Sequence, residues 1–133
     1  MHVTGFDHLV LTVASIPATV SFYEKVLGMR AEVFGPDQRT ALVFGPHKIN
    51  LHPAGREFEP KAERPMPGSA DLCLLVDSLD GIEEHLAGCG VAVLVARSTR
   101  TGARGKITSV YIRDPDNNLV ELSVYQDGTR AAQ

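Results

Sequence analysis

Two histidines stand in stretches of alternating apolar residues, where a titratable ring is uncommon. Residues 6–13 alternate with the period of a β-strand, and His8 falls on a mostly apolar face of that strand. Asn50 and His52 lie two residues apart on another strand-like stretch, so their side chains should share a face, about 6.6 Å apart along the strand. An imidazole ring can move protons or bind a metal ion. The alternatives are a hydrogen-bonded core histidine at position 8 and an exposed histidine at position 52.

The second half of the chain offers two hydroxyl groups on one strand. Ser109 and Tyr111 alternate with Val110 and Ile112, so the two hydroxyls should share the polar face of that strand. Tyr111 can orient a substrate oxygen or donate a proton to it. Its alternative role is to fill the interior as an amphipathic side chain.

Positive charge gathers in one short segment of this acidic chain. We expect residues 97–106 to form a loop because glycine and arginine recur there, and Gly102 and Gly105 would let the loop move as a lid. Its cations could bind a carboxylate or an enolate, or they could form an ordinary solvated surface. These cations are Arg97, Arg100, Arg104 and Lys106.

An internal repeat indicates which elements position these residues. The segment that starts at His8 recurs at Asp71, 63 residues later, and the helix-ending Gly28 recurs as Gly90. A repeat of strand, helix and three strands predicts an α+β fold of two βαβββ modules, whose curved mixed sheets surround a shared cleft.

The boundaries of the two modules follow from the same repeat. We assign the first module to residues 5–53 and the second to residues 70–127. Residues 54–69 are rich in proline, glycine and charge, and they form the linker between the modules. Together these parts make one domain of residues 1–133, a length that can bury a sizeable core.

The first module should contain one helix and four strands. A strand over 6–13 precedes a helix over 16–27, with Ser15 as its N-cap, Pro17 in its first turn and Gly28 at its end. The apolar stripe of the helix should pack on the apolar side of the first strand. The helix stripe consists of Ile16, Val20, Tyr23 and Leu27, and the apolar side of the strand consists of Leu9, Leu11 and Val13. Three further strands should follow, over 30–35, 39–44 and 48–52.

The second module should repeat this order. A strand over 70–76 leads to a helix capped by Ser78, then to a strand near 91–96 and a final hairpin that turns at residues 113–118. The buried face of this helix should comprise Leu79, Ile82, Leu86 and Cys89.

Composition excludes several classes of function. The 133 residues are 44% hydrophobic and 22% charged, with a net charge of −3, which is typical of a globular protein and argues against a nucleic-acid partner. No apolar run approaches the ~20 residues of a membrane span, and the first residues lack the features of a signal peptide. We therefore expect a cytoplasmic protein that contacts no membrane and has free thiols, with Cys73 in a buried strand and Cys89 near a helix end.

Three motifs occur in a characteristic order: His8 in the first strand, residues 22–29 at the end of the first helix, and residues 114–122 in the last hairpin. Together they resemble the vicinal oxygen chelate superfamily, which includes glyoxalase I, extradiol ring-cleaving dioxygenases, fosfomycin-modifying enzymes and bleomycin-binding proteins. The resemblance covers residues 6–125. Residues 48–52, 67–73 and 102–105 further resemble a branch that contains glyoxalase-domain-containing protein 5 and bacterial proteins labelled as virulence proteins or dioxygenase-related.

The resemblance implies a cleft that holds a divalent metal ion through the first and last strands of each module. The first-strand positions are His8 and Asp71, and the last-strand positions are Glu121 and either Asn50 or His52. The repeat aligns Asn50 with Glu121, but imidazole is a better ligand than an amide for a transition metal, so we favour His52. A set of His8, His52 and Glu121 would suit Fe, Mn, Zn or Ni and would leave coordination positions open for catalysis.

The function that the resemblance implies is a metal-dependent dioxygenase, lyase or isomerase acting on a small substrate with vicinal oxygens. Asp71 stands where ring-cleaving dioxygenases usually have histidine; it could still be a ligand, or the general base of an isomerase or lyase. A dioxygenase would instead use Tyr111 or a spare histidine as its acid–base partner. Asn50, Ser109 and Arg104 are the expected substrate contacts. The alternative is a non-catalytic small-molecule-binding protein of the bleomycin-resistance type, and by analogy with the family we expect a homodimer.

Overall fold

The computed structural model describes residues 1–128 of the chain. It divides between Gly68 and Ser69 into two compact units. Each unit contains one helix and one four-stranded sheet, which confirms the α+β class and the repeat of strand, helix and three strands. None of the helices in residues 1–128 is long and apolar enough to cross a membrane.

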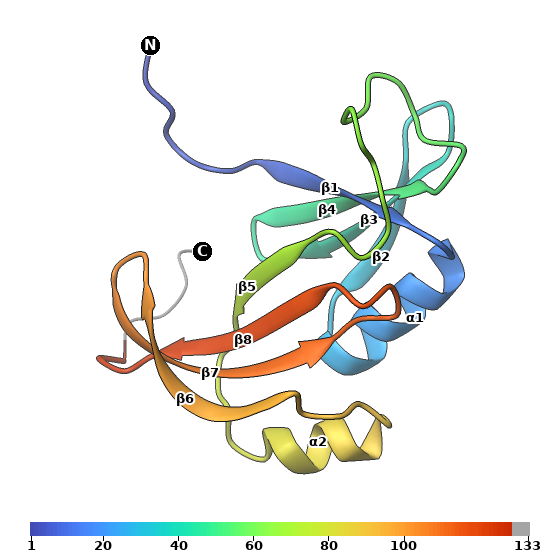
Figure 1. The fold of residues 1–133 in the computed structure, drawn as a ribbon. Coiled ribbons are helices and arrows are strands. Elements are labelled where there is room, and N and C mark those ends of the chain that lie inside the picture. Colours follow the sequence, from blue (N-terminus) through green and yellow to red (C-terminus); the bar gives the residue numbers. More distant parts are fainter. Residues whose placement is uncertain (129–133) are drawn as a thin grey trace. The chain divides into compact units, whose positions relative to one another are not determined.

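The first unit contains a mixed sheet with the strand order β1-β4-β3-β2 (Figure 1). β1 runs parallel to β4, whereas the β4–β3 and β3–β2 pairs are antiparallel. Its elements are β1 (His8–Val13), α1 (Ile16–Leu27), β2 (Arg30–Phe34), β3 (Arg39–Phe44) and β4 (His47–Pro53).

The second unit repeats this topology with the strand order β5-β8-β7-β6. β5 runs parallel to β8, and the remaining pairs are antiparallel, as in the first unit. Its elements are β5 (Asp71–Leu75), α2 (Ile82–Gly88), β6 (Val95–Gly102), β7 (Gly105–Arg113) and β8 (Leu119–Tyr125). The repeated register allows positions of the two units to be compared strand by strand.

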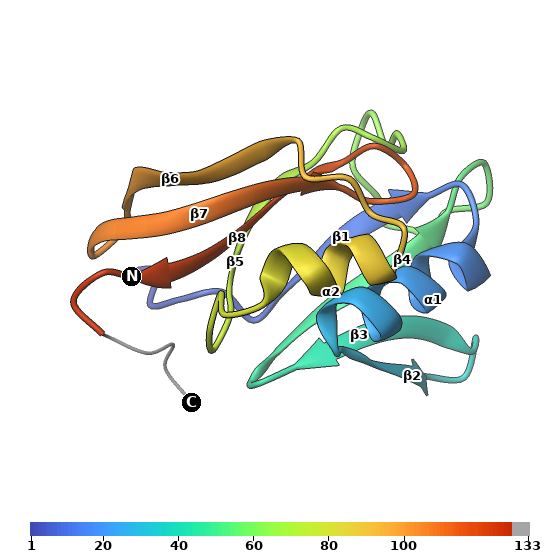
Figure 2. The ribbon, with the colours of Figure 1, turned by 90° about the horizontal axis from the view of Figure 1, so that it is seen from below.

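Helix α1 begins and ends as its sequence predicts. The Ser15 hydroxyl accepts a hydrogen bond from the Ala18 amide at 3.2 Å, and Gly28 ends the helix in the left-handed conformation with φ 68°. Tyr23 is fully buried as expected, but the other buried residues are Thr19 and Val26, whereas Val20 and Leu27 are half-buried. The buried stripe is therefore rotated by about one residue from the predicted one, while α1 still lies along the first sheet (Figure 2).

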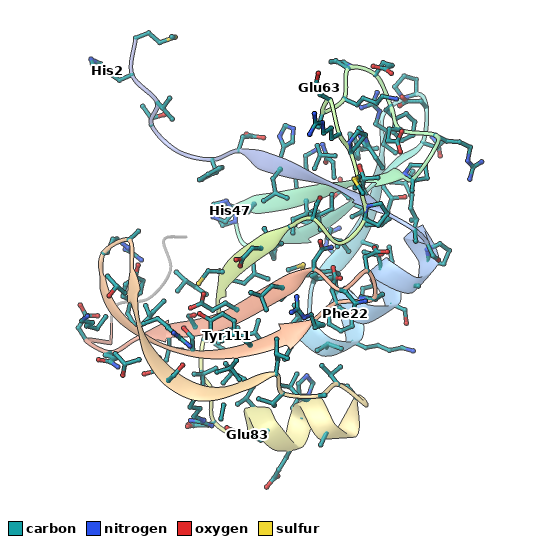
Figure 3. The ribbon with its side chains drawn as sticks, in the orientation of Figure 1. His2, Phe22, His47, Glu63, Glu83 and Tyr111 are labelled. Atoms are coloured by element: carbon teal, nitrogen blue, oxygen red, sulfur yellow. The ribbon has the colours of Figure 1, made fainter. Side chains whose placement is uncertain are left out.

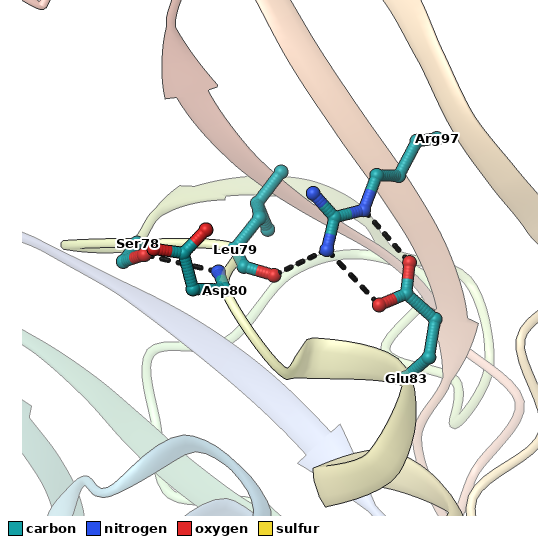
Figure 4. A network of polar contacts seen from close by, with 5 residues as sticks. All are labelled: Ser78, Leu79, Asp80, Glu83 and Arg97. Atoms are coloured by element: carbon teal, nitrogen blue, oxygen red, sulfur yellow. Dashed lines mark hydrogen bonds and ion pairs between the residues drawn. The ribbon is translucent and has the colours of Figure 1, made fainter.

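Helix α2 departs from its prediction at both ends. It starts at Ile82 with Gly81 at the N-cap, because Ser78 instead accepts a hydrogen bond from the Asp80 amide in a preceding turn. Leu79 and Leu86 are buried as predicted, but Cys89 is exposed. The Arg97 guanidinium of β6 links this region together, donating to both Glu83 carboxylate oxygens at 2.7 and 3.0 Å and to the Leu79 carbonyl at 2.5 Å (Figure 4).

The prediction that residues 97–106 form a basic loop is wrong. Residues 95–102 form β6, which pairs with β7, so all four cationic residues lie on the β6–β7 hairpin and not on a loop. The β-branched Thr99 and Thr101 favour a strand, and β7 supplies its pairing partner. The hairpin at residues 113–118 is confirmed: the Asp114 carboxylate accepts hydrogen bonds from the Asp116 and Asn118 amides across the turn.

Candidate functional site

The polar face of the first sheet carries the candidate ligands of the first unit. His8, Asn50 and His52 all lie on this face, because directly paired residues of neighbouring strands point to the same side. Asn50 lies two residues along the register from His8, about 6.6 Å, whereas His52 lies four residues along it, about 13 Å. The register thus places Asn50 closer to His8. The pairs that define it are His8–Lys48, Val10–Asn50 and Thr12–His52.

His8 presents an open imidazole. Its side chain is 42% exposed, which excludes the alternative of a buried core histidine. Nδ1 lies 2.6 Å from the Asp7 carboxylate. An ionised carboxylate can only accept, so Nδ1 carries the proton and the lone pair of the neutral ring is on Nε2. A carboxylate on the far nitrogen is the usual support of a metal-binding histidine. The same contact lowers the pKa of Asp7 through the hydrogen bond and the charge of His8.

Asn50 holds a buried oxygen atom that lacks a partner. The residue is only 8% exposed, and its Oδ1 makes no hydrogen bond to any of residues 1–128. Leaving such an oxygen buried and unpaired is costly, about 1–3 kcal/mol for a polar group. An amide oxygen in this situation suits a ligand or a hard divalent cation.

His52 lies in a closed environment at the far end of β4. The residue is buried, and its ring meets the Phe58 ring edge-on with 5.3 Å between the centroids. The Arg39 guanidinium lies over the Phe58 ring, 4.4 Å from its centroid. Burial, followed by the charge of Arg39, lowers the pKa of His52, while Glu57 acts in the opposite direction. Such a ring stays neutral at physiological pH.

Glu121 is the best-supported carboxylate of the second unit. It is half-buried on β8, and the Ser109 hydroxyl of β7 donates to its Oε2 at 2.5 Å. Ser109 Oγ also lies 2.7 Å from Ser123 Oγ, and Cys73 Sγ lies 3.3 Å from Ser123 Oγ. Ser109 and Ser123 are fully buried. The expected substrate contact Ser109 therefore binds Glu121 in this structure.

Tyr111, which is labelled in Figure 3, lies on β7. The register of β7 and β8 pairs it with Glu121. Burial raises the pKa of Tyr111, and a hydrogen bond to Glu121 and the charge of that carboxylate raise it further; the nearby Arg100 guanidinium has the opposite effect. Arg100 lies over the Tyr111 ring, 5.2 Å from its centroid. The phenol is therefore protonated at neutral pH and can donate a proton or a hydrogen bond.

The remaining candidates of the second unit lie at its margins. Asp71 is exposed at the start of β5, on the same face as Glu121 and two residues away in the register. Arg104 lies in the turn of the β6–β7 hairpin, where its guanidinium covers the Tyr125 ring at 4.8 Å. Cys73 was expected in a buried strand, but its face of β5 is exposed.

Several residues of this site were not predicted from the sequence. Ser123 and Cys73 contact the Glu121 network, and Arg100 covers Tyr111. Alternation along β8 could have identified Ser123, which lies two residues after Glu121 on the same face. Arg100 is one of the cations that the sequence predicts to bind an anion, but its place over Tyr111 could not be predicted because its strand is predicted as a loop. Within residues 1–128, no three histidine, cysteine, aspartate or glutamate side chains gather closely enough to hold a metal ion.

Comparison with known proteins identifies the family. The model of the Glyoxalase/Bleomycin resistance protein/Dioxygenase superfamily matches residues 5–122. The chain belongs to this superfamily. The superfamily match confirms the resemblance that His8 and the two longer motifs indicated.

Close relatives of the chain within the superfamily come from bacteria and a fungus. The chain is 49% identical to virulence protein STM3117 of Salmonella typhimurium over 94% of its own length and 87% of the relative. It is 51% identical to glyoxalase domain-containing protein RDO1 of Mycosarcoma maydis over 96% of its own length and 72% of the relative. An integron cassette protein of Vibrio cholerae has a solved structure with a TM-score of 0.91 and 54% identity, covering 95% of this chain and 98% of that one.

Solved structures with lower sequence identity share the fold of this chain. Lactoylglutathione lyase of Agrobacterium tumefaciens superposes with a TM-score of 0.68 at 21% identity, covering 92% of this chain and 94% of that one. TnmS3, an antibiotic-binding protein of Streptomyces, gives a TM-score of 0.70 at 21% identity, covering 92% and 96%. One of these neighbours is named as an enzyme and the other as a binding protein, so the fold by itself does not distinguish the two functions.

Proposed function

We propose that this protein is a small divalent-metal-dependent enzyme acting on a small substrate that presents two adjacent oxygens. The observation that carries the proposal is Glu121, a half-buried carboxylate held at one oxygen by a fully buried serine hydroxyl. A carboxylate supported in this way is typical of a metal ligand. His8, with Asp7 on Nδ1, supplies a matching nitrogen donor from the first unit.

The proposed cation takes His8, Glu121 and one side chain of β4. The chemistry of the donors favours His52, whereas the register and the unpaired Oδ1 favour Asn50. These donor types fit Fe, Mn, Zn or Ni, with Mn the metal that best tolerates an amide oxygen. Such a cation, when bound, polarises substrate oxygens as a Lewis acid.

The chain's own residues supply the proton transfers. Tyr111 is a protonated phenol beside Glu121, and we assign it to donate a hydrogen bond or a proton to a substrate oxygen. Asp71 is an exposed carboxylate on the same face of the sheet, and we assign it to accept a proton from the substrate carbon or hydroxyl. Arg104 lies at the other end of the sheet, in the β6–β7 turn over Tyr125, where it would attract an anionic group of the substrate.

Metal analysis tests this proposal. The protein is purified without chelator, both aerobically and anaerobically, and its metal content is measured and then titrated with Fe(II), Mn(II), Zn(II) and Ni(II). We expect about one equivalent per chain, with iron indicating oxygen chemistry and nickel or zinc indicating isomerisation. Protein that contains only traces of metal and cannot be loaded would contradict the enzyme proposal.

A second candidate is a metal-free small-molecule-binding protein. It is favoured by the stacked cation–aromatic pairs on the polar faces of both sheets, such as Lys48 over Phe34 at 3.8 Å and Arg100 over Tyr111. A double variant, His8→Ala with Glu121→Gln, discriminates between the candidates. Loss of metal from this variant supports the enzyme, whereas unchanged metal content and unchanged ligand affinity support the binding protein.

A further inference from the structure

We propose that Ser109 and Ser123 form a directed hydrogen-bond chain that fixes the Glu121 carboxylate for cation binding, which makes Ser109 a positioning residue. The inference rests on the proposed function, because it assigns to Glu121 the role of metal ligand. It concerns two fully buried hydroxyls and one exposed thiol on three neighbouring strands: Ser109 on β7, Ser123 on β8 and Cys73 on β5.

The direction of the chain follows from the number of protons available. An ionised carboxylate only accepts, so the 2.5 Å contact requires Ser109 to donate its single hydroxyl proton to Glu121 Oε2. Ser109 Oγ must then accept from Ser123 across the 2.7 Å contact. Ser123 has no further proton, so its 3.4 Å approach to Oε2 is secondary, and its own oxygen accepts from the Cys73 thiol at 3.3 Å. Each hydrogen bond from Cys73 through Ser123 and Ser109 is therefore donated in the direction of Glu121.

Burial makes this arrangement rigid. Ser109 and Ser123 are both 0% exposed, so water cannot replace either hydroxyl as a partner. Rotating either hydroxyl away would leave a buried polar group unpaired, which is costly. The short contact to Oε2 has the length of a charge-assisted hydrogen bond, which is about twice as strong as a neutral one.

The first unit lacks such a hydrogen-bond chain, which indicates that the chain of serine hydroxyls serves Glu121 specifically. The register pairs Tyr111 with Glu121 and Ala41 with Asn50, so Asn50 is the counterpart of Glu121. By the same repeat, Arg39 and His52 occupy the places of Ser109 and Ser123. No hydroxyl among residues 1–128 holds the Asn50 oxygen. The serines are therefore not a requirement of the repeated fold.

The test compares Mn(II) affinity, measured by the electron paramagnetic resonance signal of free Mn(II), in wild type and Ser109→Ala. We expect the affinity of Ser109→Ala to fall by about 10–100-fold, the usual loss when a supporting hydrogen bond to a ligand is removed. Ser98→Ala is the matched control. Ser98 lies on β6 and pairs directly with Ser109 of β7, and the buried Ser98 hydroxyl has no partner within residues 1–128. The affinity of Ser98→Ala should stay within about twofold of wild type.

A double-mutant cycle separates positioning from a general effect on folding. Glu121→Asp shortens the carboxylate so that Ser109 no longer reaches it, and Ser109→Ala added to this variant should change Mn(II) affinity by no more than about twofold. Ser123→Ala, which leaves the Ser109 donor in place, should lose less affinity than Ser109→Ala. If Ser109→Ala fails to fold, the comparison of Ser123→Ala with Ser98→Ala decides, and equal affinities overturn the proposal.

A readout without metal distinguishes this inference from the proposed function. The infrared carboxylate stretch of Glu121, assigned by its absence in Glu121→Gln, should shift in metal-free Ser109→Ala because a strong hydrogen bond is lost. A shift combined with unchanged Mn(II) affinity overturns the positioning role and leaves the enzyme proposal intact. Wild-type protein that binds no Mn(II), Fe(II), Zn(II) or Ni(II) overturns both.

Discussion

Asn50 carries a buried polar atom that should lower the stability of the metal-free protein. Its buried Oδ1 has no partner within residues 1–128, although the rest of β4 is well packed between its neighbours. Buried polar atoms without partners are rare in folded proteins, and they often mark the place of a ligand or an ion.

Replacing Asn50 by leucine should therefore stabilise the metal-free protein. Leucine has a similar size and removes the unpaired oxygen, so we expect the free energy of unfolding to rise by roughly 1 kcal/mol in urea denaturation without metal. If Asn50 also binds the cation, the same variant should gain less stability from added Mn(II) than wild type. A variant that is less stable than wild type without metal would show that the oxygen has a partner in solution.

The sequence could identify candidate residues but not their surroundings. Alternation correctly placed Asn50 and His52 on one face, because strand pleating depends only on position along the chain. Only the register of β1 and β4 shows that His8 shares this face. Alternation could not show that Ser109 donates to Glu121 or that Phe58 closes over His52, because these contacts join different elements. The preference for His52 came from ligand chemistry alone, and only the register shows its four-residue separation from His8.

The helices illustrate how local geometry determines element boundaries. Gly28 ends α1 at φ 68°, and a Cβ built there would meet no atom within 4 Å. Any cost of a side chain at this position is therefore backbone strain and not a clash.

Gly28→Ala should lower the free energy of unfolding by about 1 kcal/mol, because alanine disfavours the left-handed conformation. Gly88→Ala is the control: Gly88 lies within α2, has no positive φ and also has open space at its Cβ, so alanine should be neutral or stabilising. Equal effects of the two substitutions in chemical denaturation would contradict this account of the α1 end.

The Arg97–Glu83 pair should make stability depend on pH. The hydrogen bonds from Arg97 lower the pKa of Glu83 to about 2, from an ordinary value of 4.5. A depressed carboxyl pKa contributes stability that is fully present above pH 4.5 and is lost as the pH falls toward about 2.

Glu83→Gln should therefore lower the thermal midpoint at pH 7, and the difference from wild type should shrink as the pH falls from 4.5 to about 2, where about half of the native Glu83 carboxyls are protonated. Glu84→Gln is the matched control, since Glu84 is the next residue of α2 and is exposed. A difference between Glu83→Gln and wild type that stays constant from pH 7 to pH 2 would contradict the pairing. The effect is measured by circular dichroism at low ionic strength.

Most elements could be predicted because their signals are local. Ser15 and Gly28 define α1, and the Asp114–Asn118 turn defines the last hairpin. The two failures have different causes. β6 forms because β7 offers a pairing partner, which overrides the local glycine and arginine signals. α2 starts after Ser78 because that side chain completes a local turn with the Asp80 amide and does not cap the helix.

At the scale of the whole molecule, the repeat is the central fact. Both units have the same topology and the same parallel pairing of their first and last strands. Their polar faces nevertheless differ: the first presents His8 and an unpaired amide oxygen, and the second presents a hydrogen-bonded carboxylate with a protonated phenol. In the proposed function each unit therefore contributes a different part of the chemistry.

The family analogy predicts a homodimer, which light scattering after size exclusion can test. At micromolar concentration we expect the measured molar mass of the eluting protein to be twice that of one chain. A monomer that binds one equivalent of metal would contradict the dimer and retain the enzyme proposal.

The most direct test of the central claim is electron spin echo spectroscopy of the Mn(II)-loaded full chain. We expect nitrogen modulation from a bound imidazole in wild type, its loss in His8→Gln, and loss of Mn(II) binding in Glu121→Gln. His52→Gln, measured in parallel, should keep the modulation from His8 and reveals whether a second imidazole contributes. Nitrogen modulation that persists unchanged in His8→Gln, or undiminished Mn(II) binding in Glu121→Gln, would contradict the claim that these two side chains hold the same cation.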